Sequence, residues 1–329
     1  MFIIRFIFTI LHCFILLLLA GTLLNAYIAP QTFGWLNLLS LGFPFLIIVY
    51  VLFCVFWIVS FKKRGIVFLL ALVLFLTPIR RWINFSAPPK DKPHLEVLSF
   101  NIKNNGLNKE ASESYLNPLK HDVLMLQECG TSETDKPHLQ NFPYVVHYPI
   151  ISIYSKYKIT GHGKILNDTN NGHAQYADIE INGKIIRFVN IYLEPFYLHK
   201  SMVRPSKNID VNEEKAKDLV KRLIPTFKIH QEQVDKIKDF IGNSPYPIVL
   251  GGDFNSVPNS YEYYQLSESL YDAFLESGNG FGTSFHDYKF PIRIDYLFSS
   301  KQIKPVNYKI DRSIHLSDHF PVSASFLIQ

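Results

Sequence analysis

Five short segments combine acidic, amide and imidazole side chains in patterns that could bind a divalent cation and transfer protons. Each lies beside a short apolar run that is typical of a β-strand. Because strand ends from distant parts of a chain can meet at one edge of a sheet, we expect their polar residues to converge. The segments are Ser99-Phe100-Asn101, Leu126-Gln127-Glu128, Gly251-Gly252-Asp253-Phe254-Asn255, Arg293-Ile294-Asp295-Tyr296 and Ser317-Asp318-His319.

The acidic residues of these segments predict a metal site. Glu128, Asp253, Asp295 and Asp318 would repel one another strongly if they met without a cation. Carboxylate and amide oxygens are the ligands that hard divalent ions prefer, so we expect Mg²⁺ or Mn²⁺. The chain has three Cys and lacks paired His at ligand spacing, which argues against zinc.

The ordered set of motifs resembles the endonuclease/exonuclease/phosphatase (DNase I-like) superfamily, and the resemblance covers residues 95–328. The motifs are Ser-Phe-Asn-Ile, Gln-Glu, Gly-Asp-Phe-Asn-Ser-x-Pro, Arg-Ile-Asp-Tyr and Ser-Asp-His-Phe-Pro-Val. The resemblance implies an α/β (α+β) fold, a four-layer sandwich of two packed mixed β-sheets flanked by helices. It also implies a metal-dependent hydrolase that acts on phosphate esters.

On the metal side, the resemblance implies a role for three residues. Glu128 matches the family's principal metal ligand, and Asn101 matches the amide that helps to position the metal or the phosphate. Asp318 matches a second acid close to the metal.

On the phosphate side, Asp253 matches the acid that orients or deprotonates the attacking water. Asn255 matches the amide that binds the developing phosphoryl charge. His319 matches the imidazole that contacts the phosphate, and Asp295 matches the carboxylate that keeps this imidazole charged and oriented. In-line displacement at phosphorus needs such an activated water, charge clamp and cation.

One strand motif departs from the family pattern. Many members have Asn-x-His where this chain has Asn190-Ile191-Tyr192, and abasic-site endonucleases resemble it in having Tyr there. Tyr192 can donate a hydrogen bond to a phosphate oxygen, but a phenol with a pKa of about 10 supplies a proton poorly at pH 7. Lys103 is expected either to face the phosphate or to be a solvated loop residue.

The N-terminal segment is predicted to be a membrane anchor over residues 1–85. Between Arg5 and Lys62 the sequence has no charged residue, and one crossing needs about 20 apolar residues. We expect spans near residues 7–27, 36–61 and 65–82. The alternative is a cleaved signal peptide followed by a buried hairpin.

The net charge of +5 divides unevenly along the chain. Residues 1–92 hold eight basic residues and one acidic residue, a charge of +7, and the remainder carries −2. By the positive-inside bias, the turn at Lys62, Lys63 and Arg64 belongs in the cytoplasm. This predicts a multi-pass protein whose large domain faces the non-cytoplasmic, periplasmic side, although Arg80 and Arg81 oppose this orientation.

The proline-rich residues 86–93 are predicted to be a linker, and residues 94–329 the catalytic domain. Residues 196–240 look like a charged insert, either a solvated helical hairpin or a lip that touches substrate or membrane. Helices are expected over residues 111–119 and 231–241. Strands are expected over residues 95–100, 123–126, 150–154, 176–181, 185–193, 248–250, 294–298 and 322–327.

The sequence leaves the substrate open. A nuclease acting on a phosphodiester is the default, and a phosphomonoester is a further option. A phospholipid or a small phosphoester is the alternative, because the domain is slightly acidic. A non-catalytic membrane-bound binding protein is the alternative of another class, and no obligate protein partner is expected.

Overall fold

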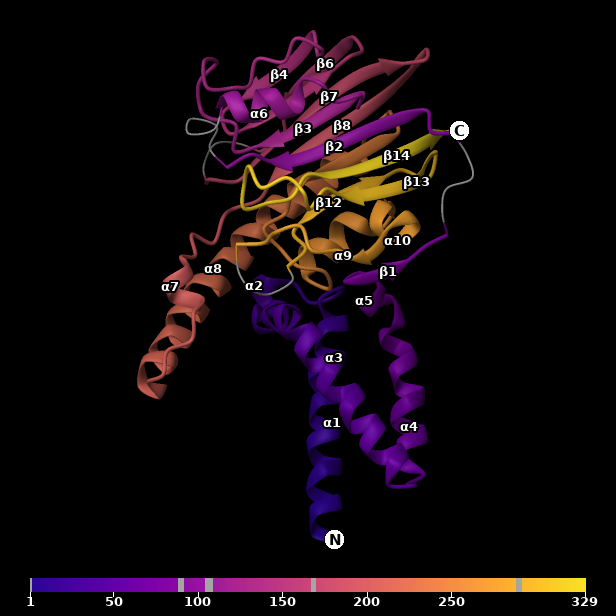
Figure 1. Cartoon of the computed structure of the whole chain (residues 1–329), viewed down its shortest axis with the longest axis vertical. Helices are drawn as coiled ribbons and strands as arrows, with labels where there is room; N and C mark the ends of the chain where they lie inside the picture. Colours follow the sequence, from indigo (N-terminus) through magenta and orange to yellow (C-terminus); the bar gives the residue numbers. More distant parts are fainter. Residues whose placement is uncertain (1, 88–91, 104–108, 167–169, 288–291) are drawn as a thin grey trace.

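The computed structural model describes residues 2–87, 92–103, 109–166, 170–287 and 292–329. It places an N-terminal helical segment against one side of a domain that is built on two β-sheets (Figure 1). Residues 88–91 of the predicted linker lie outside the described residues. Ser86 already contacts the domain, because its backbone N–H donates to Asn279 Oδ1 at 3.0 Å.

Two long apolar helices pack against each other in the N-terminal segment, α1 (Phe2–Leu24) and α3 (Trp35–Val59). By length and composition both could cross a membrane, and they correspond to the first two predicted spans. Residues 65–82, predicted as a third span, form a chain of short helices instead of one long helix. The shorter helices of this segment are α2 (Pro30–Phe33), α4 (Arg64–Ala71), η1 (Leu72–Phe75) and α5 (Leu76–Arg80).

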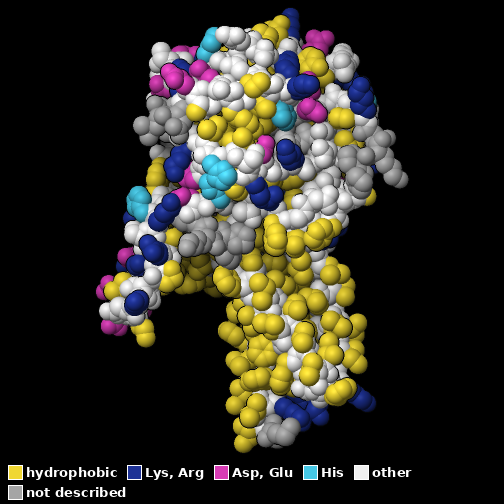
Figure 2. Space-filling model, viewed as in Figure 1, with side chains coloured by type: hydrophobic (Ala, Val, Ile, Leu, Met, Phe, Trp, Pro, Cys, Tyr) yellow, Lys and Arg dark blue, Asp and Glu magenta, His cyan; other side chains and the backbone are white. Residues whose placement is uncertain are grey.

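The outer surface of the N-terminal segment is apolar. Figure 2 shows hydrophobic side chains over almost the whole visible length of the segment, with Lys and Arg side chains at its far end. Tyr50, Trp57 and Phe75 are buried between the helices. An exposed apolar surface of this extent is typical of a membrane or protein contact.

The first sheet has the strand order β13-β14-β2-β3-β5-β4, and within it only the β2–β3 pair is parallel. Its strands are β2 (Leu95–Asn101), β3 (Val123–Gln127), β4 (Tyr144–Tyr148), β5 (Ile151–Ser155), β13 (Ile303–Ile310) and β14 (Val322–Ile328).

The second sheet has the order β10-β12-β9-β8-β7-β6, and β8–β9 is its parallel pair. Its strands are β6 (Ile159–Lys164), β7 (His173–Ile181), β8 (Lys184–Tyr192), β9 (Ile248–Asp253), β10 (Tyr271–Asp272) and β12 (Asp295–Ser299). A further antiparallel pair, β1 (Ile83–Phe85) with β11 (Asn279–Phe281), joins the end of the anchor to the domain.

The sheets pack face to face, and helices cover their outer faces. Val97 and Met125 of the first sheet share a core with Phe188 and Leu297 of the second. α6 (Lys109–Leu116) covers the first sheet, and α8 (Ile209–Gly242) and α9 (Tyr261–Ser267) cover the second. The predicted four-layer sandwich is thereby confirmed.

Several elements differ from the sequence prediction. The predicted helix over residues 231–241 is the end of α8, which begins 22 residues earlier at Ile209. Its first half is mixed in charge and contains Pro225, so its apolar periodicity is weak. This half contacts the short helix α7 (Lys200–Val203), and both lie in the predicted charged insert. Elements missed from the sequence are β1, β4, β6, β10, β11, β13, α9 and α10 (Ala273–Ser277).

Candidate active site

The predicted site residues lie at one end of the sandwich, where the two sheets meet. Asn101 ends β2 and Glu128 directly follows β3 in the first sheet. In the second sheet Tyr192 pairs with Asp253, which in turn pairs with Asp295 across β8, β9 and β12. The side chain of Asn101 bridges the sheets, because its Nδ2 donates to Glu128 Oε1 and to Asp253 Oδ2, both at 3.0 Å.

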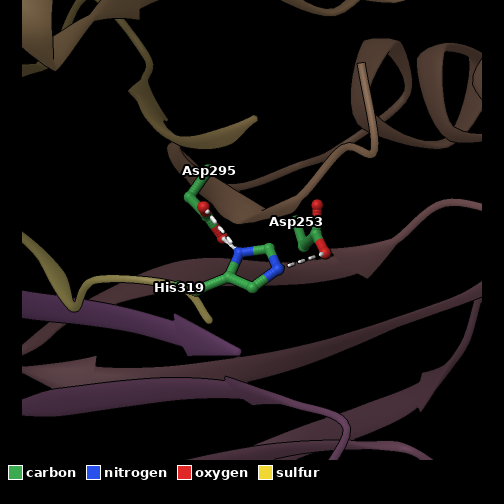
Figure 3. A group of neighbouring side chains, drawn as sticks. All are labelled: Asp253, Asp295 and His319. Carbon is green, nitrogen blue, oxygen red and sulfur yellow. Dashed lines mark hydrogen bonds and ion pairs between the residues drawn. The ribbon is translucent and has the colours of Figure 1, made fainter. Parts of the chain in front are cut away.

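His319 lies between two carboxylates that the second sheet provides (Figure 3). Its Nδ1 donates to Asp295 Oδ2 at 2.9 Å, and its Nε2 lies 3.7 Å from Asp253 Oδ2. Burial alone would lower the pKa of His319, but the charges of Asp295 and Asp253 raise it to about 10. The imidazole is therefore a buried cation near neutral pH.

Asp253 is held on both carboxylate oxygens. Asn101 donates to Oδ2, and the backbone N–H of Asn255 donates to Oδ1 at 2.8 Å. Burial, together with the charge of Asp295, raises the pKa of Asp253 to about 7, although His319 opposes this shift. A carboxylate with such a pKa can accept a proton near neutral pH.

Glu128 adopts a left-handed backbone conformation, with φ of 52°, which turns its side chain into the site. Its Oε1 accepts hydrogen bonds from Asn101 and from the hydroxyl of Tyr192 at 3.1 Å. Burial and the neighbouring charges of Glu128 and Asp253 raise the pKa of Tyr192 above its usual range. Tyr192 is therefore a neutral hydrogen-bond donor, which agrees with the expectation that it supplies protons poorly.

Lys103 and Asp318 form a partly exposed ion pair, with Nζ 2.6 Å from Oδ2. Burial alone would raise the pKa of Asp318, but His319 and Lys103 lower it. Lys103 is half exposed, so its charge faces both Asp318 and the solvent.

The oxygen atoms around Glu128 are suited to binding a hard cation. A cavity of about 360 Å³ opens there, and its wall includes Glu128, Tyr192 and Asn171. Neither Glu128 nor Asp253 forms an ion pair with Lys or Arg among the residues that the structure describes. The carboxylate of Glu128, which has no cationic partner among these residues, is suited to Mg²⁺ or Mn²⁺.

A second group of possible ligands fits a metal less well. Oxygen and nitrogen atoms of Asp253, Asp295 and His319 lie within 4.8 Å of one another. A metal ligand must be deprotonated, whereas the imidazole of His319 is held in its cationic form. This group therefore suits a phosphate oxygen better than a metal ion.

A family model described as the endonuclease/exonuclease/phosphatase family matches residues 98–319, which is more than half of the chain. The chain belongs to this family. Endonuclease/exonuclease/phosphatase proteins are generally dependent on divalent metals. A second family model, described as a domain of unknown function, matches residues 5–82, and no curated protein matches the chain significantly.

Solved structures of the family share the fold. A family member from Bacteroides vulgatus is 18% identical, with a TM-score of 0.52, over 71% of this chain and 99% of its own. TDP2 from D. rerio, complexed with a single-strand DNA product, is 16% identical, with a TM-score of 0.50, over 71% and 98%. A 3′ phosphatase from Neisseria, bound to a product DNA hairpin, is 15% identical, with a TM-score of 0.50, over 71% and 99%.

The structure brings together all the residues singled out in the sequence, but with two differences in detail. Asn101 directs its nitrogen toward the carboxylates, while its Oδ1 accepts from the backbone N–H of Lys103 at 3.0 Å, so it acts as a brace. Asn255 uses its side chain to donate to the carbonyl of Leu193 at 2.9 Å.

Sequence reasoning missed Ser284, which supports the site from a loop. Its Oγ accepts hydrogen bonds from the backbone N–H groups of Ile294 and Asp295, both at 3.1 Å. It also missed Glu194, which follows Tyr192 by two residues and is buried. A charged residue directly after an apolar strand was the available signal for Glu194, and Ser284 had none.

Proposed function

We propose that the chain is a membrane-held phosphoesterase, with an anchor over residues 1–85, a linker over 86–93 and a catalytic domain over 94–329. Its substrate carries a phosphodiester, with a nucleic acid as the default. The observation that carries the proposal is the buried His319–Asp295 pair facing Asp253 (Figure 3). A buried cation next to a buried base suits hydrolysis at phosphorus.

The protein residues divide the reaction between them. Asp253 accepts the proton of the attacking water, since its pKa of about 7 permits this near neutral pH. His319 and Asn255 stabilise the negative charge that develops on the phosphoryl oxygens. Asp295 keeps the imidazole of His319 oriented and charged.

The metal would be held by Glu128, with Asp318 close by and Asn101 bracing the carboxylates. When bound, Mg²⁺ or Mn²⁺ supplies Lewis-acid stabilisation of the phosphate. Tyr192 donates to Glu128 and so orients its carboxylate. Lys103 supplies a partly exposed cation that draws in an anionic substrate.

The anchor places the catalytic domain on the non-cytoplasmic side in this proposal. The basic turn between α3 and α4 lies at the end of the helices away from the domain (Figure 1). Arg80 and Arg81, which opposed this orientation, contact the domain: Arg80 Nη2 donates to the carbonyl of Leu275 at 3.0 Å and Arg81 Nη1 to Asn259 Oδ1 at 2.8 Å. Because these two side chains are bound by the domain, we do not use their charges to assign the orientation by the positive-inside bias.

The test uses the full chain in phosphatidylcholine vesicles with Mg²⁺ or Mn²⁺. Single-stranded DNA, RNA, a phosphoinositide and a phospholipid are offered as substrates. We expect hydrolysis of at least one substrate, lost in Asp253→Asn and in Glu128→Gln. Failure on every substrate, or unchanged turnover in both variants, would overturn the proposal.

A lipid phosphoester is the second candidate substrate, and the arm formed by α7 and the first half of α8 favours it. The arm extends from the domain on the same side as the anchor and diverges from it (Figure 1). Ile209 at its tip is 80% exposed, and residues 200–222 hold seven basic and four acidic residues. Apolar and basic side chains together suit an anionic lipid surface.

A comparison of lipid and soluble substrates decides between the two candidates. A lipid enzyme should hydrolyse a phosphodiester in vesicles faster than the same headgroup on a soluble chain. Ile209→Asp should reduce this preference and leave hydrolysis of the soluble substrate unchanged. Equal rates on both forms would favour the soluble substrate.

A further inference from the structure

The segment that follows β8 is held at the active site by consecutive contacts. Tyr192 donates to Glu128, as described above. The backbone N–H of Leu193 donates to the carbonyl of Asp253 at 3.0 Å, and the carbonyl of Leu193 accepts from Asn255. A displacement of this short segment would therefore move groups on both the metal side and the phosphate side of the site.

The next residue, Glu194, is clamped by α8 at both its backbone groups. His230 Nε2 donates to the carbonyl of Glu194 at 2.7 Å, and Gln233 Oε1 accepts from its N–H at 3.0 Å. The carboxylate of Glu194 accepts from the backbone and the side chain of Asn171, at 2.7 and 2.9 Å. Asn171 lines the same cavity as Glu128, so the contacts of Glu194 also hold part of the cavity wall in place.

His230 joins this clamp to α9. Its Nδ1 lies 2.8 Å from Glu262 Oε1, and both side chains are completely buried. Since the carbonyl of Glu194 can only accept, Nε2 carries the hydrogen of that bond. Burial alone would raise the pKa of Glu262, but the hydrogen bond with His230 lowers it. The contact is therefore a buried hydrogen bond in which the imidazole and the carboxyl group share one proton.

Glu262 is in turn bound by the anchor. Asn37 of α3 donates its Nδ2 to both carboxylate oxygens, at 3.0 and 2.9 Å, and its Oδ1 accepts from the backbone N–H of Tyr261 at 2.7 Å. Asn37 is itself buried. A connected set of hydrogen bonds thus runs from an apolar helix of the anchor, through α9 and α8, to the segment beside the active site.

A buried pair of ionisable side chains is an expensive means of holding two parts of a chain together. Such groups lose their contact with water, and apolar contacts of the same size are often as stabilising. Such a pair does, however, fix geometry, because each hydrogen bond has a preferred length and direction. The junction has an independent polar contact in Asn25, which donates to the carbonyls of Leu36 and Asn259 at 3.0 and 2.9 Å.

We infer that Asn37 in the anchor is a positioning residue of the active site, acting through Glu262 and His230 on Glu194 and thereby on Tyr192 and the cavity wall. The inference rests on the proposed phosphoesterase function. The anchor then does more than tether the domain, because the amide of Asn37 completes the hydrogen-bond network that positions the active site.

The test compares two substitutions at the junction in the full chain, held in phosphatidylcholine vesicles with Mg²⁺ or Mn²⁺. Asn37→Ala removes the donors to Glu262, and Asn25→Ala removes a matched buried amide that is not connected to Glu194. We expect Asn37→Ala to lower kcat about tenfold, because misplaced groups slow the reaction. Asn25→Ala should lower thermal stability to a similar extent but leave kcat within about twofold.

Two further measurements separate positioning from folding. Amide hydrogen exchange over residues 193–199 should become faster in Asn37→Ala and not in Asn25→Ala. Asn37→Asp places a carboxylate against Glu262 and should lower kcat. Adding Glu262→Gln to Asn37→Asp restores a donor–acceptor pair at this position and should recover most of kcat. This rescue remains informative if Asn37→Ala does not fold.

The outcomes distinguish a failure of the proposed function from a failure of the positioning role of Asn37. If the wild-type chain hydrolyses nothing, the proposed function fails. If it is active and the Asn37 and Asn25 variants have the same kcat and the same exchange rates, the positioning role is wrong and the proposed function stands. Absence of rescue in the folded double variant would also overturn the positioning role.

Discussion

Asp295 lies directly opposite Asp253 in the antiparallel pair of β9 and β12. Both carboxylates are buried, so their charges would repel strongly in the absence of a cation. His319 provides that cation, since it donates to Asp295 and lies close to Asp253. The register of two strands and one loop imidazole thus create the charge arrangement on which the proposed chemistry depends.

Replacement of Asp295 by Asn should lower kcat by about 100-fold, because His319 loses the charge that keeps it cationic and oriented. The measurement is steady-state hydrolysis by the full chain. Asp178→Asn is the matched control, because it removes a buried ion pair with Arg187, at 2.7 Å, elsewhere in the same sheet. Asp178→Asn should reduce stability but not kcat; an equal loss of kcat in both variants would point to a general folding defect.

Replacement of Tyr192 by Phe should lower activity by less than about tenfold. Only one hydrogen bond to Glu128 is lost, and such a bond contributes about 1 kcal/mol. Tyr154→Phe serves as the control, since it removes a buried hydroxyl that donates to the carbonyl of Pro137. A loss of several hundredfold in Tyr192→Phe would instead indicate direct participation in proton transfer.

Replacement of Glu128 by Gln should weaken the binding of the divalent metal at least about tenfold, because a charged oxygen donor becomes neutral. Calorimetric titration of Mn²⁺ into the chelator-treated protein measures the same change without turnover. Glu133→Gln is the control, since Glu133 is an exposed residue paired with Lys136. Unchanged metal binding in Glu128→Gln would place the metal elsewhere.

Replacement of Asp253 by Asn should stabilise the metal-free protein at neutral and higher pH. Burial raises the pKa of Asp253 from 3.8 to about 7, so folding takes up a proton between these values. The favourable contribution of the protonated group is complete below pH 3.8 and is lost as the pH rises to about 7. Urea denaturation in EDTA should show an advantage for Asp253→Asn above pH 7 that shrinks on acidification; a difference independent of pH would refute this.

The sequence by itself determined the two-part organisation and the chemistry of the site. A long stretch without charge predicts membrane-crossing helices, and two helices that are long and apolar enough to cross a membrane are present. Residues that end apolar strands, such as Asn101 and Asp253, were found because strand periodicity and local motifs are both readable along the chain. The family resemblance carried by these motifs implied the sandwich. Strand periodicity failed for β6, whose Gly-rich sequence has little apolar pattern.

Only the tertiary structure decided which side chains contact one another through hydrogen bonds and charges. His230 and Glu262 are 32 residues apart, and each resembles an ordinary helix residue in the sequence. Glu262 meets Asn37 across 225 residues. Contacts between residues this distant depend on how the anchor packs against the domain, and local propensity carries no information about that packing. The pKa values of Asp253 and His319 likewise follow from burial and neighbouring charges, which exist only in the folded chain.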